Sequence, residues 1–263
     1  MRPTIDKLEG LYSRYNHREY VHPDPLEFLY KYSKIEDREI IGLISASLAY
    51  GNVKQIIRSV SIALQPLGES PRNFIESISK EQLVEVYANF KHRFTTGKDL
   101  AIMLIGMKDA INKHGSLNKC YLNYYSDTDP NIIKGLTGFT QELGKHYDGC
   151  AYLLPSPERG SACKRMNLYL RWMVRSDDVD PGGWDGISES KLIYPVDLHI
   201  HRLAKAFGFT NRSQANLRTA IEITEAFRDF SPEDPVKYDF SLTRLGIHPK
   251  GHYSEILGDN SSD

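Results

Sequence analysis

The stretch YPVDLHIHRLAKAFG, residues 194–208, decides between a metal-binding strand and the start of a helix. It places Asp197, His199 and His201 at alternate positions. On a β-strand these side chains would share one face, and both imidazoles could reach one metal ion. The apolar residues that follow have the three- and four-residue spacing of a helix: Ile200, Leu203, Ala204 and Phe207. The sequence therefore predicts a helix that begins after Asp197, with this aspartate as its N-cap and Gly208 as its stop.

The same prediction argues against a metal site. On a helix, His199 and His201 point about 200° apart and cannot bind one ion together. Only 66 residues follow Asp197, too few for the barrel that a D-x-H-x-H motif normally opens. We therefore expect no metal ligands here, and a metal-dependent hydrolase built on these histidines is kept only as an alternative.

A second informative stretch is GSACKRMNLYLRWMVR, residues 160–175. Its apolar residues form one helical stripe: Ala162, Met166, Tyr169, Leu170 and Met173. Between residues 156 and 175 a single acid, Glu158, accompanies five basic residues: Arg159, Lys164, Arg165, Arg171 and Arg175. We expect a local positive patch, with Lys164, Arg171 and Arg175 on the face opposite the stripe. Such a helix start, with Gly160 allowing close approach, is typical of phosphate binding, although a solvated basic face remains the alternative.

Helical periodicity also dominates the rest of the chain. It predicts a helix over residues 39–47, capped by Asp37 and continuing through residue 64, and a core helix over residues 100–111. A further helix is expected over residues 232–246, with Ser231 as its N-cap. The acidic, Pro- and Gly-containing segment 177–190 breaks the pattern and is predicted to be a loop insertion. No set of alternating strands is evident, so we predict an all-α fold.

Composition narrows the class of protein. The chain has 263 residues, 40% of them hydrophobic, and a net charge of −1, which suits a single globular unit over residues 1–263. No apolar run approaches 18 residues and the first residues lack a signal-peptide core, so we expect no membrane span and a cytoplasmic protein. The three cysteines, Cys120, Cys150 and Cys163, suit neither a disulfide framework nor a four-cysteine cluster. Residues 258–263 are expected to form a flexible tail.

The two informative stretches together resemble the helix-hairpin-helix DNA glycosylases, the superfamily of endonuclease III and the 8-oxoguanine glycosylases. The family hairpin reads roughly L-P-G-V-G-x-K-T-A-N-x-x-L. Matching positions here are Leu154, Pro155, Gly160, Lys164, Asn167 and Leu170. The family's P-V-D-x-H motif is matched by residues 195–199. The amino-acid sequence of these segments is similar to that of an uncharacterised bacterial branch of the superfamily, nearest the archaeal 8-oxoguanine glycosylase type.

The resemblance implies a two-lobed helical fold with a cleft between the lobes. It implies a base-excision repair glycosylase, with AP lyase activity, acting on an oxidised purine such as 8-oxoguanine in damaged duplex DNA. Carried over, Lys164 is the nucleophile and Asp197 the essential carboxylate. The expected DNA contacts are Arg159, Gly160, Ser161, Arg165, Arg171 and His199. The candidate residues for a base pocket are Tyr50, Trp172, Trp184 and Phe240. A monomer without a cofactor, associated with the nucleoid, follows from the same resemblance.

Three departures from the family pattern are visible in the sequence. The hairpin reads SPERGSA where the family has GVG, which puts its phosphate-binding geometry in question. Lys164 and Asp197 are 33 residues apart, a long separation that is similar to the archaeal 8-oxoguanine enzymes. The four-cysteine cluster of endonuclease III is absent, so the resemblance implies no iron–sulfur cluster. A non-catalytic helical DNA-binding protein is therefore the main alternative function.

Overall fold

The computed structural model describes residues 2–147 and 152–247. Within these ranges the chain is built mainly from helices. The strands are two short segments of two residues each, β1 (Lys91–His92) and β2 (Thr95–Thr96), which pair with each other in antiparallel orientation. The predicted all-α class is thus confirmed. No helix in the described part of the chain is both long and apolar enough to cross a bilayer. Cys150 and the predicted tail 258–263 lie outside the described residues.

The helices follow one another along the chain with short connections. The α-helices are α1 (Ile5–Tyr15), α2 (Ile35–Ser47), α3 (Val53–Leu64), α4 (Pro71–Ser77), α5 (Lys80–Val86), α6 (Gly97–His114), α7 (Leu117–Leu122), α8 (Ile133–Gly144), α9 (Lys164–Val174), α10 (Leu198–Ala206), α11 (Leu217–Arg228) and α12 (Asp239–Ile247). Short 3₁₀ helices lie at η1 (Arg18–Tyr20), η2 (Pro25–Lys31), η3 (Gln65–Leu67), η4 (Pro157–Arg159) and η5 (Glu189–Lys191).

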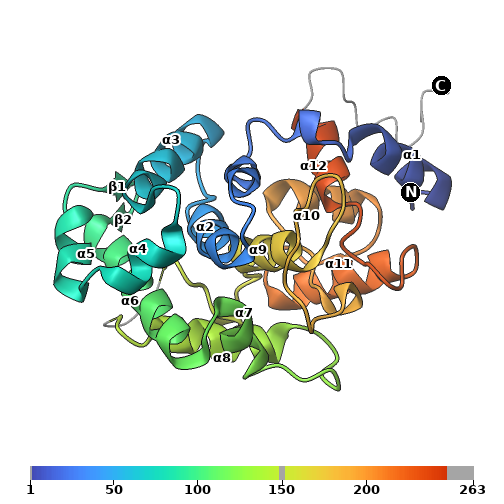
Figure 1. Ribbon diagram of the computed structural model, residues 1–263. Helices are drawn as coiled ribbons and strands as arrows, with labels where there is room; N and C mark the ends of the chain where they lie inside the picture. Colours follow the sequence, from blue (N-terminus) through green and yellow to red (C-terminus); the bar gives the residue numbers. More distant parts are fainter. Residues whose placement is uncertain (1, 148–151, 248–263) are drawn as a thin grey trace.

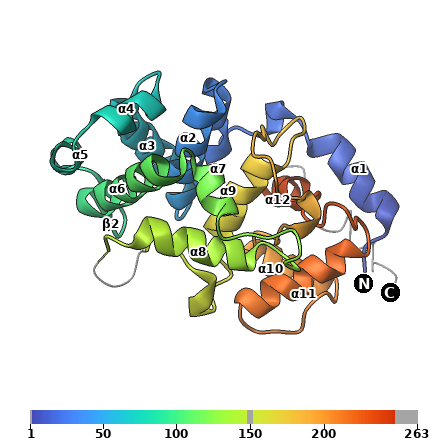
Figure 2. The ribbon, with the colours of Figure 1, turned by 60° about the horizontal axis from the view of Figure 1, so that its bottom comes forward.

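Helices α2 and α9 lie at the centre of the molecule. Figures 1 and 2 show α3 to α6 gathered on one side of this pair and α1, α10, α11 and α12 on the other. Helix α2 is buried on all sides from Glu39 to Ser47. Gly42 lets α9 approach closely, because a Cβ atom at this position would lie 3.2 Å from the Tyr169 ring. The predicted stripe of α9, which includes Tyr169, is buried as expected.

Two acidic residues of α2 bind the starts of neighbouring helices. Asp37 was predicted to cap its own helix, and this is wrong, because α2 begins at Ile35 and the Asp37 carboxylate accepts from Arg72 N of α4 at 2.8 Å. Glu39 accepts from the first backbone N–H groups of α7 at 2.9 and 3.0 Å and from Trp184 Nε1 at 3.1 Å. Burial raises the pKa of Glu39 to about 7, although these donors favour the charged form.

Two other predicted helix boundaries are wrong. The helix predicted to continue to residue 64 is broken, because α2 ends at Ser47 and a new helix, α3, starts at Val53. The break contains Gly51 at φ +99°, a conformation that a side chain disfavours, and Asn52 caps α3. The helix expected from residue 232 begins only at Asp239. Periodicity detected the helices but not these local breaks.

Segment 177–190 is a loop up to the start of η5 at Glu189, as predicted, and several of its residues are buried in the core. Asp180 has no exposed surface and binds both Arg171 and Arg175, which are 4% and 3% exposed. Arg171 also binds Asp239. The expectation that these two arginines form an exposed basic face is therefore wrong, because the acidic loop folds over them and neutralises their charge.

Candidate active site

Asp197 begins α10 as its N-cap, as the sequence predicts. Its Oδ1 atom accepts from His199 N at 2.9 Å and from Ile200 N at 2.8 Å. These N–H groups have no partner inside the helix, so a carboxylate at this position stabilises the helix start. The Oδ2 atom is thereby directed away from the helix and remains able to meet another group.

A tight hairpin presents Lys164 at the first position of α9. Gly160 follows the short helix η4 with φ +72°, and its carbonyl accepts from Leu217 N at 3.0 Å. Ser161 pairs with Asn216, the N-cap of α11. Cys163 also has a positive φ, +48°, and no side chain caps α9. The SPERGSA sequence therefore still makes a tight turn that ends at an uncapped helix start.

The two predicted catalytic side chains meet. Lys164 Nζ lies 3.2 Å from Asp197 Oδ2, and the two side chains are 35% and 31% exposed. Burial alone would raise the pKa of Asp197, but the Lys164 ammonium and the backbone donors of α10 outweigh it and hold this pKa below its usual value. The carboxylate is therefore charged at neutral pH and lies in contact with the amine.

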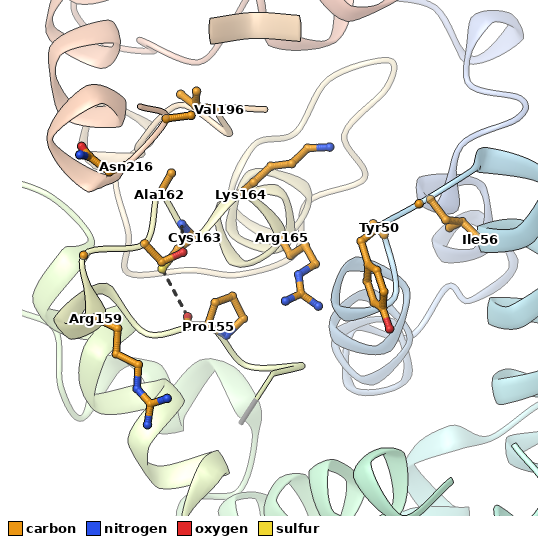
Figure 3. Close-up of a pocket in the computed structure, with 15 residues that line it drawn as sticks. Tyr50, Ile56, Pro155, Arg159, Ala162, Cys163, Lys164, Arg165, Val196 and Asn216 are labelled. Atoms are coloured by element: carbon orange, nitrogen blue, oxygen red, sulfur yellow. Dashed lines mark hydrogen bonds between the residues drawn. The ribbon is translucent and has the colours of Figure 1, made fainter. Parts of the chain in front are cut away.

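Two cavities flank Lys164, and the lining of both includes Ala49, Gly51 and Ile56. The larger, about 500 Å³, lies against the hairpin and is drawn in Figure 3. The smaller, about 230 Å³, also contains Asp197. Burial raises the pKa of the neighbouring Cys163 thiol to about 11, so this cysteine carries little nucleophilic thiolate at neutral pH.

The other predicted DNA contacts take different positions. Arg159 and Gly160 are exposed, and Ser161 is half-buried. In Figure 3 the Arg159 guanidinium is directed away from Lys164. The Arg165 guanidinium makes hydrogen bonds within the protein, because it donates to Ser47 O at 2.7 Å and to Tyr152 O at 2.5 Å. Together with the buried Arg171, this leaves fewer basic side chains for phosphate than the sequence suggests.

The four aromatic residues predicted for a base pocket do not line one cavity. Trp172 and Phe240 line the smaller cavity, and Tyr50 lines the larger one. Trp184 lies in neither lining and packs instead against Tyr169, with ring centroids 5.1 Å apart. Its position in an acidic loop gave no sign of this burial.

The histidines of the opening motif do not converge. His201 is buried, and its Nε2 lies 3.0 Å from Arg212 O, while His199 is half-buried in the first turn of α10. Among the described residues, no three His, Cys, Asp or Glu side chains are grouped as metal ligands.

The structure adds charged residues that the sequence analysis missed. Asp24, Asp239 and Arg244 all line the smaller cavity, together with Arg171. Asp239 and Arg244 flank the inward-facing Phe240 and Leu242 on one predicted helix. The sequence shows that these charged residues stand next to apolar positions that face inward. It does not show the cavity that they line, because distant parts of the chain form that cavity.

Residues 24–248 match the family described as "Protein of unknown function (DUF2400)". The chain belongs to this family. The matched range contains Lys164, Asp197 and both cavities, except for the cavity-lining Pro23. No match was found among curated proteins or among solved structures.

Proposed function

We propose that this member of the DUF2400 family is a DNA glycosylase with AP lyase activity that acts in base excision repair. The observation that carries the proposal is the contact between Lys164 Nζ and Asp197 Oδ2, at 3.2 Å, at the edge of a cavity. An amine and a charged carboxylate, each at the first turn of its own helix, are the two groups that this chemistry requires. The proposal includes a two-lobed arrangement of the helices with the site between the lobes.

The chemistry divides between the two residues. The Lys164 ammonium loses a proton to solvent, and the neutral amine attacks C1′ of the deoxyribose as the base leaves with the electrons of the glycosidic bond and takes up a proton. Asp197 is still an anion at this step and stabilises the positive charge that develops on the sugar; it then accepts a proton from the nitrogen bound to C1′. Transfer of that proton from Asp197 to O4′ opens the C1′–O4′ bond and gives an iminium ion at Lys164. Loss of a C2′ proton from this ion expels the 3′ phosphate.

The surroundings support a nucleic-acid substrate. Helix α9 begins without a side-chain cap, and the first N–H groups of such a helix favour a phosphate. Gly160 is exposed and nothing lies within 4 Å of the place where its Cβ would be, so a backbone could approach closely. The target base would have to leave the duplex to reach the cavity, at a cost of a few kcal/mol that is smallest at a lesion.

Borohydride trapping tests the proposal. Duplex DNA with an abasic site or 8-oxoguanine is incubated with the protein, and borohydride reduces any iminium ion to a stable amine link. We expect a covalent adduct with the wild-type protein and none with Lys164→Met, which keeps the length of the aliphatic chain. Adduct formation that persists in Lys164→Met, or that is absent from the wild type, would refute the lyase.

A non-catalytic DNA-binding protein is the second candidate, and the hairpin favours it. The turn at Gly160 and the uncapped start of α9 would bind a phosphate without any chemistry. Binding that weakens steeply with salt, does not distinguish lesions and yields no adduct would support this function.

A further inference from the structure

Helix α1 packs against α12, and Figures 1 and 2 show the two side by side. Glu9 accepts from Lys237 Nζ at 2.7 Å and from Tyr238 OH at 2.5 Å. The Tyr12 ring meets the Tyr238 ring edge-on, with centroids 6.3 Å apart. Lys237 and Tyr238 directly precede Asp239, which begins α12 and lines the smaller cavity. The surface on which α1 sits is therefore continuous with one wall of the candidate site.

A second route leads from α1 to the same carboxylate through buried ions. Tyr12 OH donates to Asp177 Oδ2 at 3.0 Å. From Asp177 a chain of ion pairs continues through Arg175, Asp180, Arg171 and Asp239. Buried ion pairs are screened less by salt and water than exposed ones, so the chain is a firm connection. Two separate routes from α1 thus meet at one residue of the cavity lining.

The contacts that hold α1 in place are weaker than those of the core. Its buried residues are Leu8, Leu11 and Tyr15. The Glu9 and Lys237 side chains are 42% and 26% exposed, and ion pairs of this kind add little stability. A helix of 11 residues is marginal by itself in water. Segments near a chain end open locally more often than the whole fold does, so α1 can lift while the core stays folded.

We propose that α1 is a latch for the candidate site: when seated it fixes the start of α12 and the Asp239 carboxylate, and when it lifts this wall of the smaller cavity loosens. Asp239 shares the cavity lining with Lys164 and Asp197, so its displacement changes the charge that surrounds the amine. The latch acts by position and does not touch the substrate. This role goes beyond the proposed function, and its test needs no DNA.

Charge exchange between α1 and α12 tests the latch. Glu9→Lys sets two cations against each other, Lys237→Glu sets two anions against each other, and the double variant restores a pair of opposite charges. Hydrogen exchange of the full-length protein, followed by mass spectrometry, measures how often each helix opens. We expect each single variant to exchange roughly 2- to 30-fold faster in α1 and α12, because an exposed attraction becomes a repulsion. The double variant should exchange at the wild-type rate, and α2 and α9 should be unaffected in every variant.

A probe in the cavity shows whether α1 controls the site as well as its own helix partner. Trp172 lines the smaller cavity and is 1% exposed, and Trp184→Phe leaves it as the only tryptophan. Acrylamide quenching of its fluorescence should increase in Glu9→Lys and return to the starting value in the double variant. Tyr12→Phe interrupts the second route by removing one hydroxyl group and should also increase quenching. The exchange measurement needs no tryptophan variant, so misfolding of Trp184→Phe does not remove the test.

Asp229→Lys is the matched control. Arg2 binds Asp229, so this change also sets two cations against each other, on the segment that precedes α1. Asp229 follows the last residue of α11 and does not line the smaller cavity. The variant should leave hydrogen exchange in α12 and quenching of Trp172 unchanged.

The outcomes separate the latch from the proposed enzyme. Unchanged exchange in α12, or unchanged quenching of Trp172, in the two single variants overturns the latch. Failure of the double variant to restore both quantities overturns it too, as does an equal response to Asp229→Lys. A latch that passes these tests stands even if borohydride trapping fails, and successful trapping does not rescue a latch that fails them.

Discussion

Asp197 has two roles in the structure, and one substitution should separate them. Its Oδ1 atom caps α10 through His199 N and Ile200 N, and its Oδ2 atom contacts Lys164. Asparagine keeps an oxygen for the cap and removes the charge, whereas alanine removes both. We therefore expect Asp197→Asn to lose the proposed lyase activity with little loss of stability, and Asp197→Ala to lose both.

The expected losses of stability follow from the two contacts of Asp197, the helix cap and the ion pair. Replacing an aspartate N-cap by alanine lowers the free energy of unfolding by about 1 kcal/mol, while asparagine caps about as well as aspartate. The ion pair with Lys164 is about one-third exposed on each side, so solvent screening limits its contribution to roughly 0–1 kcal/mol. Asp197→Ala should then be less stable than Asp197→Asn by about 1 kcal/mol, or about 2–4 °C in melting temperature for a chain of this size.

The assay combines urea unfolding with the rate of strand cleavage at an abasic site. Both variants should cleave roughly 10²- to 10⁴-fold more slowly than wild type, because the proton acceptor is gone. Lys164→Met provides a thermodynamic cycle with Asp197→Asn, in which the coupling should not exceed about 1 kcal/mol. Equal destabilisation by asparagine and alanine would show that the cap is not what stabilises α10. Cleavage at the wild-type rate by Asp197→Asn would refute its role in the chemistry.

Three further predictions concern stability, each measured by urea unfolding. The pKa of Glu39 is raised to about 7 by burial, so the folded state binds more protons than the unfolded state between about pH 4.5 and 7. Its contribution to stability must fall as pH rises through this window, and Glu39→Gln should remove that part of the slope; an unchanged slope would contradict the assignment. Asp180→Ala should destabilise the fold by roughly 3–5 kcal/mol, because two arginines lose a buried partner, and a loss below 1 kcal/mol would contradict this. Gly51→Ala should be more destabilising than Gly160→Ala: both have positive φ, but only at Gly51 does the new methyl meet a side chain, 2.7 Å from Arg93 Cδ. The reverse order would show that the Arg93 side chain moves away without cost.

Much of the local structure could be predicted from the sequence because its signals are local. The apolar stripe of α9 and the helix start at Asp197 both appear where the spacing places them. A cap and a stripe depend on residues a few positions apart, so a short window contains the information. The break between α2 and α3 lies at Gly51 and the N-cap Asn52, and the last helix begins only at Asp239; the spacing of apolar residues does not detect either boundary.

The charged residues show most clearly what the local sequence could not predict. Arg165, Arg171 and Arg175 belong to the predicted positive patch because Glu158 is the only acid between residues 156 and 175. In the fold, Asp180 and Asp239 neutralise Arg171, and backbone carbonyls occupy Arg165. A charge pattern along one helix does not reveal which distant carboxylate will cover it, since ion pairs depend on distance in space.

The sequence by itself determined an all-helical protein in which a lysine and an aspartate each stand at the start of a helix, since those features depend on near neighbours. Only the tertiary structure brought Lys164 within 3.2 Å of Asp197 across 33 residues of sequence and placed Asp239 and Arg244 in the adjoining cavity. The physical reason is that a cavity is the space left between packed helices. Its shape and charge therefore depend on contacts that no short window of sequence contains.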